Sequence, residues 1–186
     1  MNTQRFLKIM LCFFMLANAY EYPKRFSGYF SQHGQDKFLN EQIFKGKKSG
    51  IFLEVGAHDG ISFSNTYFFE KNLNWKGICI EPIPEVFKEL ERNRRCVCEN
   101  VCIDDKEGKK FFLKCSGFIT EMYSGIVDYY DPRHQLRIDN EILEFGGDKE
   151  IIEVNCTTLH EVLRRNNIRE FYYTCSKISP RHVFIN

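Results

Sequence analysis

The sequence predicts an α/β fold in which helices cover both faces of a mostly parallel, doubly wound sheet. Strand-like apolar runs alternate with helical segments along the chain, which is the pattern of βαβ units with right-handed crossovers. Residues 50–60 read as a buried strand followed by a glycine turn, and Glu81 ends the next predicted strand about 20 residues later. Strand, turn and helix in this order place a ligand at the carboxyl edge of such a sheet.

The first residues have the composition of a targeting segment. Arg5 and Lys8 precede an apolar run, and Ala17-Asn18-Ala19 has the small-x-small form of a cleavage site. This pattern predicts a secretory signal peptide over residues 1–19, and therefore a location in the secretory pathway or outside the cell. An uncleaved amino-terminal anchor is the alternative, although the apolar run is too short to span a bilayer comfortably.

The remaining residues, 20–186, are predicted to form one domain with a substantial core. The hydrophobic content of 43% is ordinary for such a domain. The formal net charge of +1 gives no electrostatic reason to expect a nucleic acid or an anionic membrane surface as a partner. After cleavage of the signal peptide no stable membrane span is expected.

Eight cysteines are spread along the chain, and Cys12 falls within the predicted signal peptide. Cys96, Cys98, Cys102 and Cys115 lie close enough in sequence for a zinc site to be considered. Because Cys96 and Cys98 are expected on one face of a strand, where a free cysteine behaves as a small hydrophobe, core or disulfide roles are favoured over a metal site.

Apolar spacing and cap residues predict the first elements. A helix is expected over residues 35–44, because its apolar residues recur at helical spacing, and a strand is expected over residues 51–55. Ser62 or Ser64 can cap the following helix, which should begin near Asn65. These elements form the first half of a βαβ unit.

The same pattern repeats in the next segment. A strand is expected over residues 76–80, and Pro84 suits the first turn of a helix that ends at Asn93-Arg94. Residues 96–103 alternate into a third strand. Residues 110–115 are predicted to be an added strand, either the first half of a hairpin or an edge.

The rest of the chain begins with a long insertion. Residues 116–147 show poor periodicity and are predicted to hold loops and short helices, which in compact domains often form a functional lid, with disorder as the alternative. Residues 151–156 alternate like a strand, and Thr157 or Thr158 caps a further helix. Residues 171–173 start another strand.

The glycine turn excludes two common nucleotide motifs. His58 and Ile61 stand where a dinucleotide fingerprint needs glycines, and the Gly-Lys-Ser/Thr end of a phosphate loop is absent after Gly60. The remaining pattern, Glu-x-Gly-x-x-x-Gly, is that of a turn that presents backbone N–H groups to a cofactor. Glu81, at the tip of the next strand, can accept two hydrogen bonds from a ribose diol, with a solvated loop residue as the alternative.

In combination, these motifs resemble those of FkbM-type methyltransferases, a branch of the class I S-adenosylmethionine-dependent methyltransferases. They cover about half of the chain. They are Ser31-Gln32-His33-Gly34-Gln35-Asp36, Phe52-Leu53-Glu54-Val55-Gly56-Ala57-His58-Asp59-Gly60, Ser64-Asn65-Thr66, Phe69-Glu70-Lys71, Trp75-Lys76-Gly77, Ile80-Glu81-Pro82-Ile83-Pro84, Phe87, Leu90 and Asn93-Arg94.

The resemblance implies a Rossmann-like sheet of seven strands, S-adenosylmethionine as cofactor and methyl donor, and a sugar oxygen or another small-molecule hydroxyl as acceptor. By position, the methionine part of the cofactor would be surrounded by Glu54, Gly56, Ala57, Asp59 and Gly60.

Three further positions follow from the same resemblance. Glu81 would hold the ribose hydroxyls, and the segment around Asn100–Cys102 would flank the adenine unless Asn100 only ends a strand. Residues 31–36 would close one side of the pocket.

The sequence departs from the family pattern near its end. The family continues with a small-apolar-Asp-x-Glu-Gly segment, whereas this sequence reads Thr174-Cys175-Ser176 and shows neither carboxylate. The expectation is therefore a domain whose carboxyl-terminal strands, roughly its last third, are missing. His33 and His58 flank the predicted pocket and titrate in the useful range, but no catalytic residue is assigned.

Two functions remain open. One is an exported methyltransferase that acts on a small molecule or a glycan. The other is a non-catalytic, truncated secreted protein that acts by binding, or a gene fragment.

Overall fold

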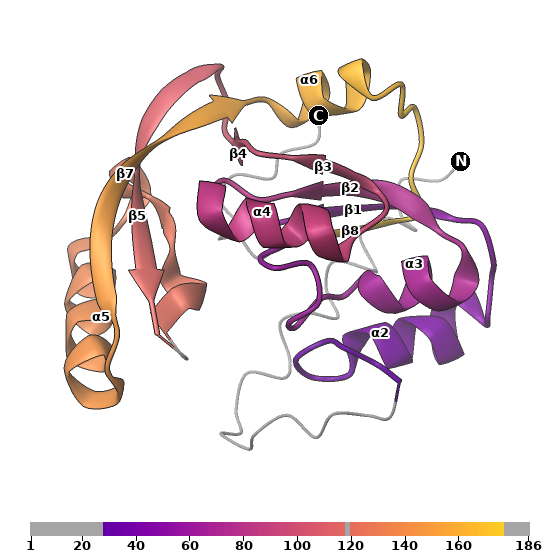
Figure 1. Cartoon of the computed structure of the whole chain (residues 1–186), viewed down its shortest axis with the longest axis horizontal. Helices are drawn as coiled ribbons and strands as arrows, with labels where there is room; N and C mark the ends of the chain where they lie inside the picture. Colours follow the sequence, from indigo (N-terminus) through magenta and orange to yellow (C-terminus); the bar gives the residue numbers. More distant parts are fainter. Residues whose placement is uncertain (1–27, 118–119, 177–186) are drawn as a thin grey trace.

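The computed structural model describes residues 28–117 and 120–176. The predicted signal peptide and the segment that follows the last strand lie outside these residues. In the described part of the chain, the strands form two four-stranded sheets, which Figure 1 shows on the right and left of the molecule.

The first sheet is parallel throughout and has the order β3-β2-β1-β8. Its strands are β1 (Ile51–Val55), β2 (Lys76–Ile80), β3 (Val97–Glu99) and β8 (Tyr173–Ser176). The central strands are almost entirely buried, which explains why they read as apolar runs rather than as alternating ones. The strands predicted over residues 51–55 and 76–80 are confirmed at both ends.

Helices cover both faces of this sheet, so the predicted doubly wound α/β class is confirmed. One face packs on η1 (Leu39–Phe44), α3 (Tyr67–Leu73) and α4 (Pro84–Asn93), with Phe52 and Phe69 in its core, and α2 (Gln35–Phe38) leads directly into η1. The other face packs on α6 (Leu159–Arg165) through Leu53, Ile78 and Val162. In Figure 1, α2 and α3 lie below the sheet and α6 above it.

The predicted helix starts and ends agree with local contacts. The helix expected over residues 35–44 is present, but its second half is a π-helix. Ser64, one of the two predicted cap residues, accepts hydrogen bonds from the backbone N–H groups of Thr66 and Tyr67 at 3.2 and 3.0 Å. The helix itself begins at Tyr67, two residues later than predicted. Thr158 caps α6 by accepting from the N–H of Glu161.

The third predicted strand, residues 96–103, is two strands in two sheets. β3 ends at Glu99, and β4 (Cys102–Ile103) pairs with a strand of the second sheet. The chain leaves the first sheet at Asn100, whose side-chain amide donates to the carbonyls of Glu81 and Pro82 at 2.8 and 3.1 Å. Alternation alone could not show this break, since the side chains on both sides of it are partly or fully buried.

The second sheet is mixed and has the order β4-β7-β5-β6. Its long strands are β5 (Gly108–Ser116) and β7 (Asp148–Thr157), which pair antiparallel over the whole length of β5, and β6 is Gly125–Ile126. The strand predicted over residues 110–115 therefore lies inside a sheet, between β7 and β6, and not at an edge. The seven-stranded single sheet that the resemblance implied is, in the described residues, divided between two sheets.

The insertion predicted over residues 116–147 holds more regular structure than expected. It contains η2 (Thr120–Tyr123), η3 (Val127–Tyr129) and the 14-residue helix α5 (Pro132–Phe145). Asp131 caps α5 by accepting from the N–H of Arg133. α5 packs on β5 through Ile138, next to Leu113 and Cys115 (Figure 1). Only a narrow stripe of α5 is buried, which explains its weak periodic signal.

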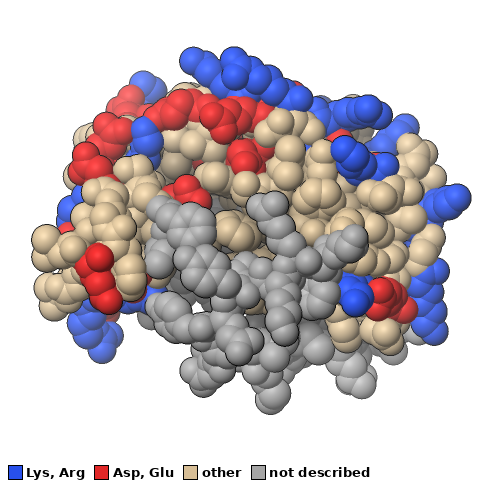
Figure 2. Space-filling view, turned by 60° about the horizontal axis from the view of Figure 1, so that its bottom comes forward, with Lys and Arg blue, Asp and Glu red and all other residues tan. Residues whose placement is uncertain are grey.

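Charge is distributed without a dominant sign on the face shown in Figure 2, where Asp and Glu side chains form a row with Lys and Arg side chains beside it. In the part of the chain that the structure describes, no helix is both long and apolar enough to cross a membrane.

Candidate functional site

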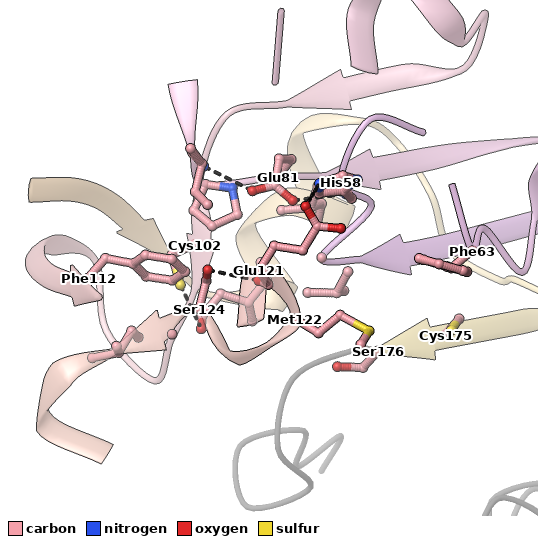
Figure 3. Close-up of a pocket in the computed structure, with 18 of the residues that line it drawn as sticks. His58, Phe63, Glu81, Cys102, Phe112, Glu121, Met122, Ser124, Cys175 and Ser176 are labelled. Carbon is pink, nitrogen blue, oxygen red and sulfur yellow. Dashed lines mark hydrogen bonds and ion pairs between the residues drawn. The ribbon is translucent and has the colours of Figure 1, made fainter. Parts of the chain in front are cut away.

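The first sheet has a topological switch point beside β1, because β2 and β3 lie on one side of it and β8 on the other. In open α/β sheets, ligands bind at such a point, beyond the carboxyl ends of the strands. A cavity of about 340 Å³ lies there, lined by the ends of β1, β2 and β8 and by residues of η2 and β6 (Figure 3). Its size is within the range of small-molecule sites.

The glycine turn forms one wall of this cavity through Gly56, whose φ of 74° needs a glycine. The N–H groups of Gly56 and Ala57 both donate to the carbonyl of Ile80 at 2.9 Å. The N–H of His58 donates to Glu81 at 2.9 Å. The expectation that the turn offers these three groups to a cofactor is thus wrong, because they join the turn to β2.

Glu81 follows β2 and lines the cavity, as its predicted role requires. Its carboxylate accepts from the backbone N–H groups of His58 at 2.9 Å and Ile83 at 3.0 Å. These two contacts fix the carboxylate at the cavity wall, where Figure 3 shows it beside His58.

Glu54 belongs to the site only indirectly. Its side chain is fully buried and does not line the cavity. The carboxylate accepts from Ser64 Oγ at 2.8 Å, from Thr66 Oγ1 at 2.5 Å and from the N–H of Asn65 at 3.2 Å. Glu54 therefore holds the far end of the turn, and the structure gives it no contact with the cavity.

Arg94, which follows α4, completes this buried network. Its guanidinium donates to Glu54 at 3.3 Å, Glu70 at 2.6 Å, Thr66 Oγ1 at 2.8 Å and the carbonyl of Gly60 at 3.0 Å. The side chains of Arg94 and Glu54 are both 0% exposed. The sequence showed Arg94 only as part of a motif, and its role as the cation that joins α4 to the turn was missed.

Asp59 and Gly60 also shape the turn from outside the cavity. Asp59 accepts from the N–H groups of Ile61 and Ser62 and from Ser62 Oγ. Burial alone would raise the pKa of Asp59, but the hydrogen bonds, with that of the His58 side chain first among them, hold it well below its usual range. Gly60 packs against Leu90 of α4 and against Arg94, which follows that helix.

The two other predicted cofactor residues, Ala57 and Asn100, contribute to the fold around the cavity and not to its lining. Ala57 is fully buried in the core of the first sheet, and Asn100 joins the ends of β2 and β3 as described above. Of the seven predicted cofactor residues, Gly56 and Glu81 line the cavity; the other five, Glu54, Ala57, Asp59, Gly60 and Asn100, lie behind its wall.

Asn65 lines the cavity, and one polar atom of its side chain has no hydrogen-bond partner among the described residues. Its side-chain amide donates to Cys175 Sγ at 2.9 Å, whereas its Oδ1 is buried and has no hydrogen-bond partner among the described residues. A buried acceptor without a partner is costly, so this oxygen at the cavity wall requires a donor from outside the described chain, either water or a bound ligand. The sequence marked Asn65 as the start of a helix and as part of a family motif, but assigned it no contact with the cofactor.

The remaining walls come from segments far apart in the sequence. Gln32 and Gln35 line one side, as predicted for residues 31–36. Another side is lined by Val101 and Cys102, which belong to the segment expected to flank the adenine, and by Ile103. His33 is exposed and does not line the cavity.

The insertion supplies the wall opposite the turn. Glu121 and Met122 of η2, Ser124, and Gly125 and Ile126 of β6 all line the cavity, as the prediction of a functional insertion requires. Poor periodicity gave no signal for any single one of them.

His58 and Glu121 meet across the cavity. His58 Nε2 lies 3.6 Å from Glu121 Oε2, and His58 Nδ1 lies 3.7 Å from Asp59 Oδ1. The φ of His58 is 54°, a left-handed conformation that is uncommon for a residue with a side chain. Figure 3 shows Glu121 reaching toward His58 from the insertion.

Among the described residues, no group of three His, Cys, Asp or Glu side chains is arranged to hold a metal ion, and the seven described cysteines are free thiols.

The parallel sheet, its switch point and the cavity at the carboxyl ends of its strands define a Rossmann-like α/β protein with a cavity of small-molecule size. The family model described as "Methyltransferase FkbM domain" matches residues 54–173, more than half of the chain. The chain therefore belongs to the FkbM methyltransferase family, within the class I S-adenosylmethionine-dependent methyltransferases. No curated protein and no solved structure was found to match it.

Proposed function

We propose that this protein binds S-adenosylmethionine and transfers its methyl group to a hydroxyl oxygen of a small molecule or a glycan. The observation that carries the proposal is one cavity that joins Gly56, Glu81 and the orphaned Oδ1 of Asn65 at the switch point of the sheet. As part of the same proposal, residues 1–19 direct this activity to the secretory pathway.

The residues of the cavity fit the proposed cofactor. Glu81 is positioned to accept hydrogen bonds from a ribose diol, and Val101, Ile103 and Ile126 offer apolar surface for an adenine ring. The methionine part of the cofactor carries an ammonium group. This group can donate the hydrogen bond that Asn65 Oδ1 does not receive from the described residues.

The acceptor side of the cavity lies between the turn and the insertion. Gln32, Glu121 and Ser176 present uncharged and acidic polar groups there, beside the apolar side chains of Phe63 and Met122. These side chains suit a neutral, hydroxyl-bearing acceptor, because hydroxyl groups bond well to amide and carboxylate oxygens.

His58 and Glu121 are the titratable side chains best placed to take the acceptor proton. Bound S-adenosylmethionine supplies an electrophilic methyl group, and the acceptor oxygen must be aligned with it. In the proposed roles, His58 accepts the hydroxyl proton as the oxygen attacks, and Glu121 orients His58 and stabilises its charged form. This pair would replace the carboxylates that the family carries after the strand that is β8 here.

Cofactor binding is tested by calorimetric titration of S-adenosylmethionine into the purified protein. Glu81→Gln is expected to weaken binding by about 10- to 100-fold, since a hydrogen bond to a charged group contributes about 1.5 to 3 kcal/mol. Glu89→Gln is the matched control, because Glu89 is exposed on α4 and should leave affinity unchanged. A folded wild-type protein that shows no saturable binding would refute the proposed function.

The acid–base role is tested by comparing His58→Gln with His33→Gln. His58→Gln is expected to lower kcat by about 100-fold or more, as for loss of a general base, with little change in cofactor affinity. His33→Gln should have no effect, since His33 lies in the same region but outside the cavity. The measurement is release of S-adenosylhomocysteine with a panel of neutral sugars as acceptors.

Two outcomes would contradict parts of the proposal. Equal rates for His58→Gln and wild type would exclude His58 as the base. Tight cofactor binding without turnover across the acceptor panel would favour the non-catalytic binding protein over the enzyme.

A further inference from the structure

Three cysteines form a cluster on one face of the first sheet, apart from the cavity. Cys79 lies on β2 and Cys98 on β3, and the two are direct register partners across the parallel ladder. Cys96 immediately precedes β3, and its Sγ lies 3.5 Å from Cys79 Sγ. The Cys98 thiol donates to the backbone carbonyl of Cys96 at 3.6 Å.

The environments of Cys79 and Cys96 differ in a way that gives the two thiols different chemistry. Cys79 is fully buried, and burial raises the pKa of its thiol well above the usual range. Cys96 is partly exposed. The hydrogen bond from the Cys79 thiol, helped by the charge of Arg94, holds the pKa of Cys96 well below its usual range against the effect of burial.

The less buried of the two cysteines is thus the one favoured as a thiolate, and the fully buried cysteine beside it remains a thiol. The thiolate is the form that attacks an oxidant. A nearby thiol in contact with an oxidised cysteine is what converts it into a disulfide.

We propose that Cys96 and Cys79 form an oxidative modification site that reacts with hydroperoxides and closes to a disulfide. In the first step, the Cys96 thiolate attacks one peroxide oxygen, the O–O bond breaks, and Cys96 becomes a sulfenic acid while the other oxygen leaves as alkoxide or hydroxide. In the second, Cys79 Sγ attacks Cys96 Sγ, the Cys79 proton and the sulfenic hydroxyl leave as water, and the S–S bond forms.

The geometry requires a modest movement for the second step. A disulfide has an S–S length of about 2.05 Å, so the sulfurs must approach by roughly 1.5 Å from their present separation of 3.5 Å. The Cys98 thiol donates its hydrogen bond to the backbone carbonyl of Cys96 and so points toward the backbone. Cys79 is therefore the thiol placed to resolve an oxidised Cys96.

The site is connected to the glycine turn through one contact. Cys79 Sγ lies 4.0 Å from Glu54 Oε2, at the edge of the buried network that holds residues 60–66. Disulfide formation removes the Cys79 thiol hydrogen from the vicinity of Glu54.

The test treats the reduced, full-length protein with hydrogen peroxide or tert-butyl hydroperoxide and identifies disulfides by mass spectrometry of peptide fragments. The expected product is a Cys79–Cys96 link with loss of two hydrogen atoms. Cys96→Ser should abolish the link, whereas Cys79→Ala should leave a Cys96 sulfenic acid that dimedone traps. Cys98→Ser and Cys115→Ser are the controls and should still form the link.

Three results would overturn the proposal. They are absence of a disulfide in a folded, peroxide-treated sample, a link that joins Cys98 to either partner instead, and persistence of the same product in Cys96→Ser. Thermal unfolding of each variant before treatment shows that the fold is intact.

Discussion

Replacing Arg94 by Met is expected to lower the free energy of unfolding by about 3 to 5 kcal/mol, because removing one partner of a buried ion pair leaves the other charge unpaired. The guanidinium contacts Glu54, Glu70, Thr66 and the Gly60 carbonyl, and its side chain is fully buried. Met keeps most of the apolar volume of the arginine stem, so the loss measures the polar network. Urea unfolding followed by circular dichroism gives the difference.

Two further variants separate the network from other effects of the substitution. Arg92→Met removes an exposed arginine from the last turn of α4, two residues before Arg94, and should change stability by less than about 0.5 kcal/mol, as for most surface sites. The double variant Arg94→Met/Glu54→Gln should be less unstable than the sum of the single variants, because it removes the uncompensated carboxylate. A loss below about 1 kcal/mol for Arg94→Met, or additive effects in the double variant, would contradict the network.

The same variant carries a functional consequence. Arg94 holds the Gly60 carbonyl and the Thr66 hydroxyl, which lie at the two ends of the segment that leads from the turn into α3. Asn65 lies in this segment and lines the cavity. Arg94→Met should therefore weaken S-adenosylmethionine binding as well as the fold, although Arg94 itself does not line the cavity.

The sequence was sufficient to predict the elements that depend on local pattern. β1 and β2 are mostly apolar because both of their faces are covered, and the glycine turn and Glu81 follow them at the expected places. Pro84 begins α4 and Thr158 caps α6, since these signals act within one turn of the chain.

Features that depend on long-range contacts could not be predicted in the same way. The break at Asn100 is stabilised by carbonyls that precede it by 18 and 19 residues, so nothing beside Asn100 in the sequence indicates it. Glu121 reaches the cavity because β5 and β6 pair, and that pairing has no local signature.

In the candidate site, too, the sequence predicted which residue types are present but not how their side chains are oriented. The acids Glu54 and Glu81 occupy equivalent places at or near strand ends. The Glu54 carboxylate is enclosed by the hydroxyl groups of Ser64 and Thr66, whereas the Glu81 carboxylate faces the cavity. A motif reports which residue types are present, but the direction of each carboxylate depends on packing of α3 and α4 that the motif does not encode.

Gly60 provides the second large expected effect, and it tests why this position is a glycine. Its φ is 82°, and a Cβ built there would lie 2.7 Å from both Arg94 Cγ and Leu90 Cδ1. Gly60→Ala is therefore expected to cost about 1 to 2 kcal/mol for the left-handed backbone and about 1 to 3 kcal/mol more for overpacking against α4. Urea unfolding measures the total.

Gly46→Ala is the matched control, because Gly46 has a similar φ of 73° but no atom within 4 Å of the position that a Cβ would take. It should show the backbone cost alone, about 1 to 2 kcal/mol. If Gly60→Ala is no more destabilising than Gly46→Ala, packing against α4 is not what requires the glycine. If Gly60→Ala is more destabilising but keeps the cofactor affinity of wild type, the glycine serves the fold and not the cavity. The contacts of Gly60 favour a combined loss, since a displaced Arg94 would release the segment that carries Asn65.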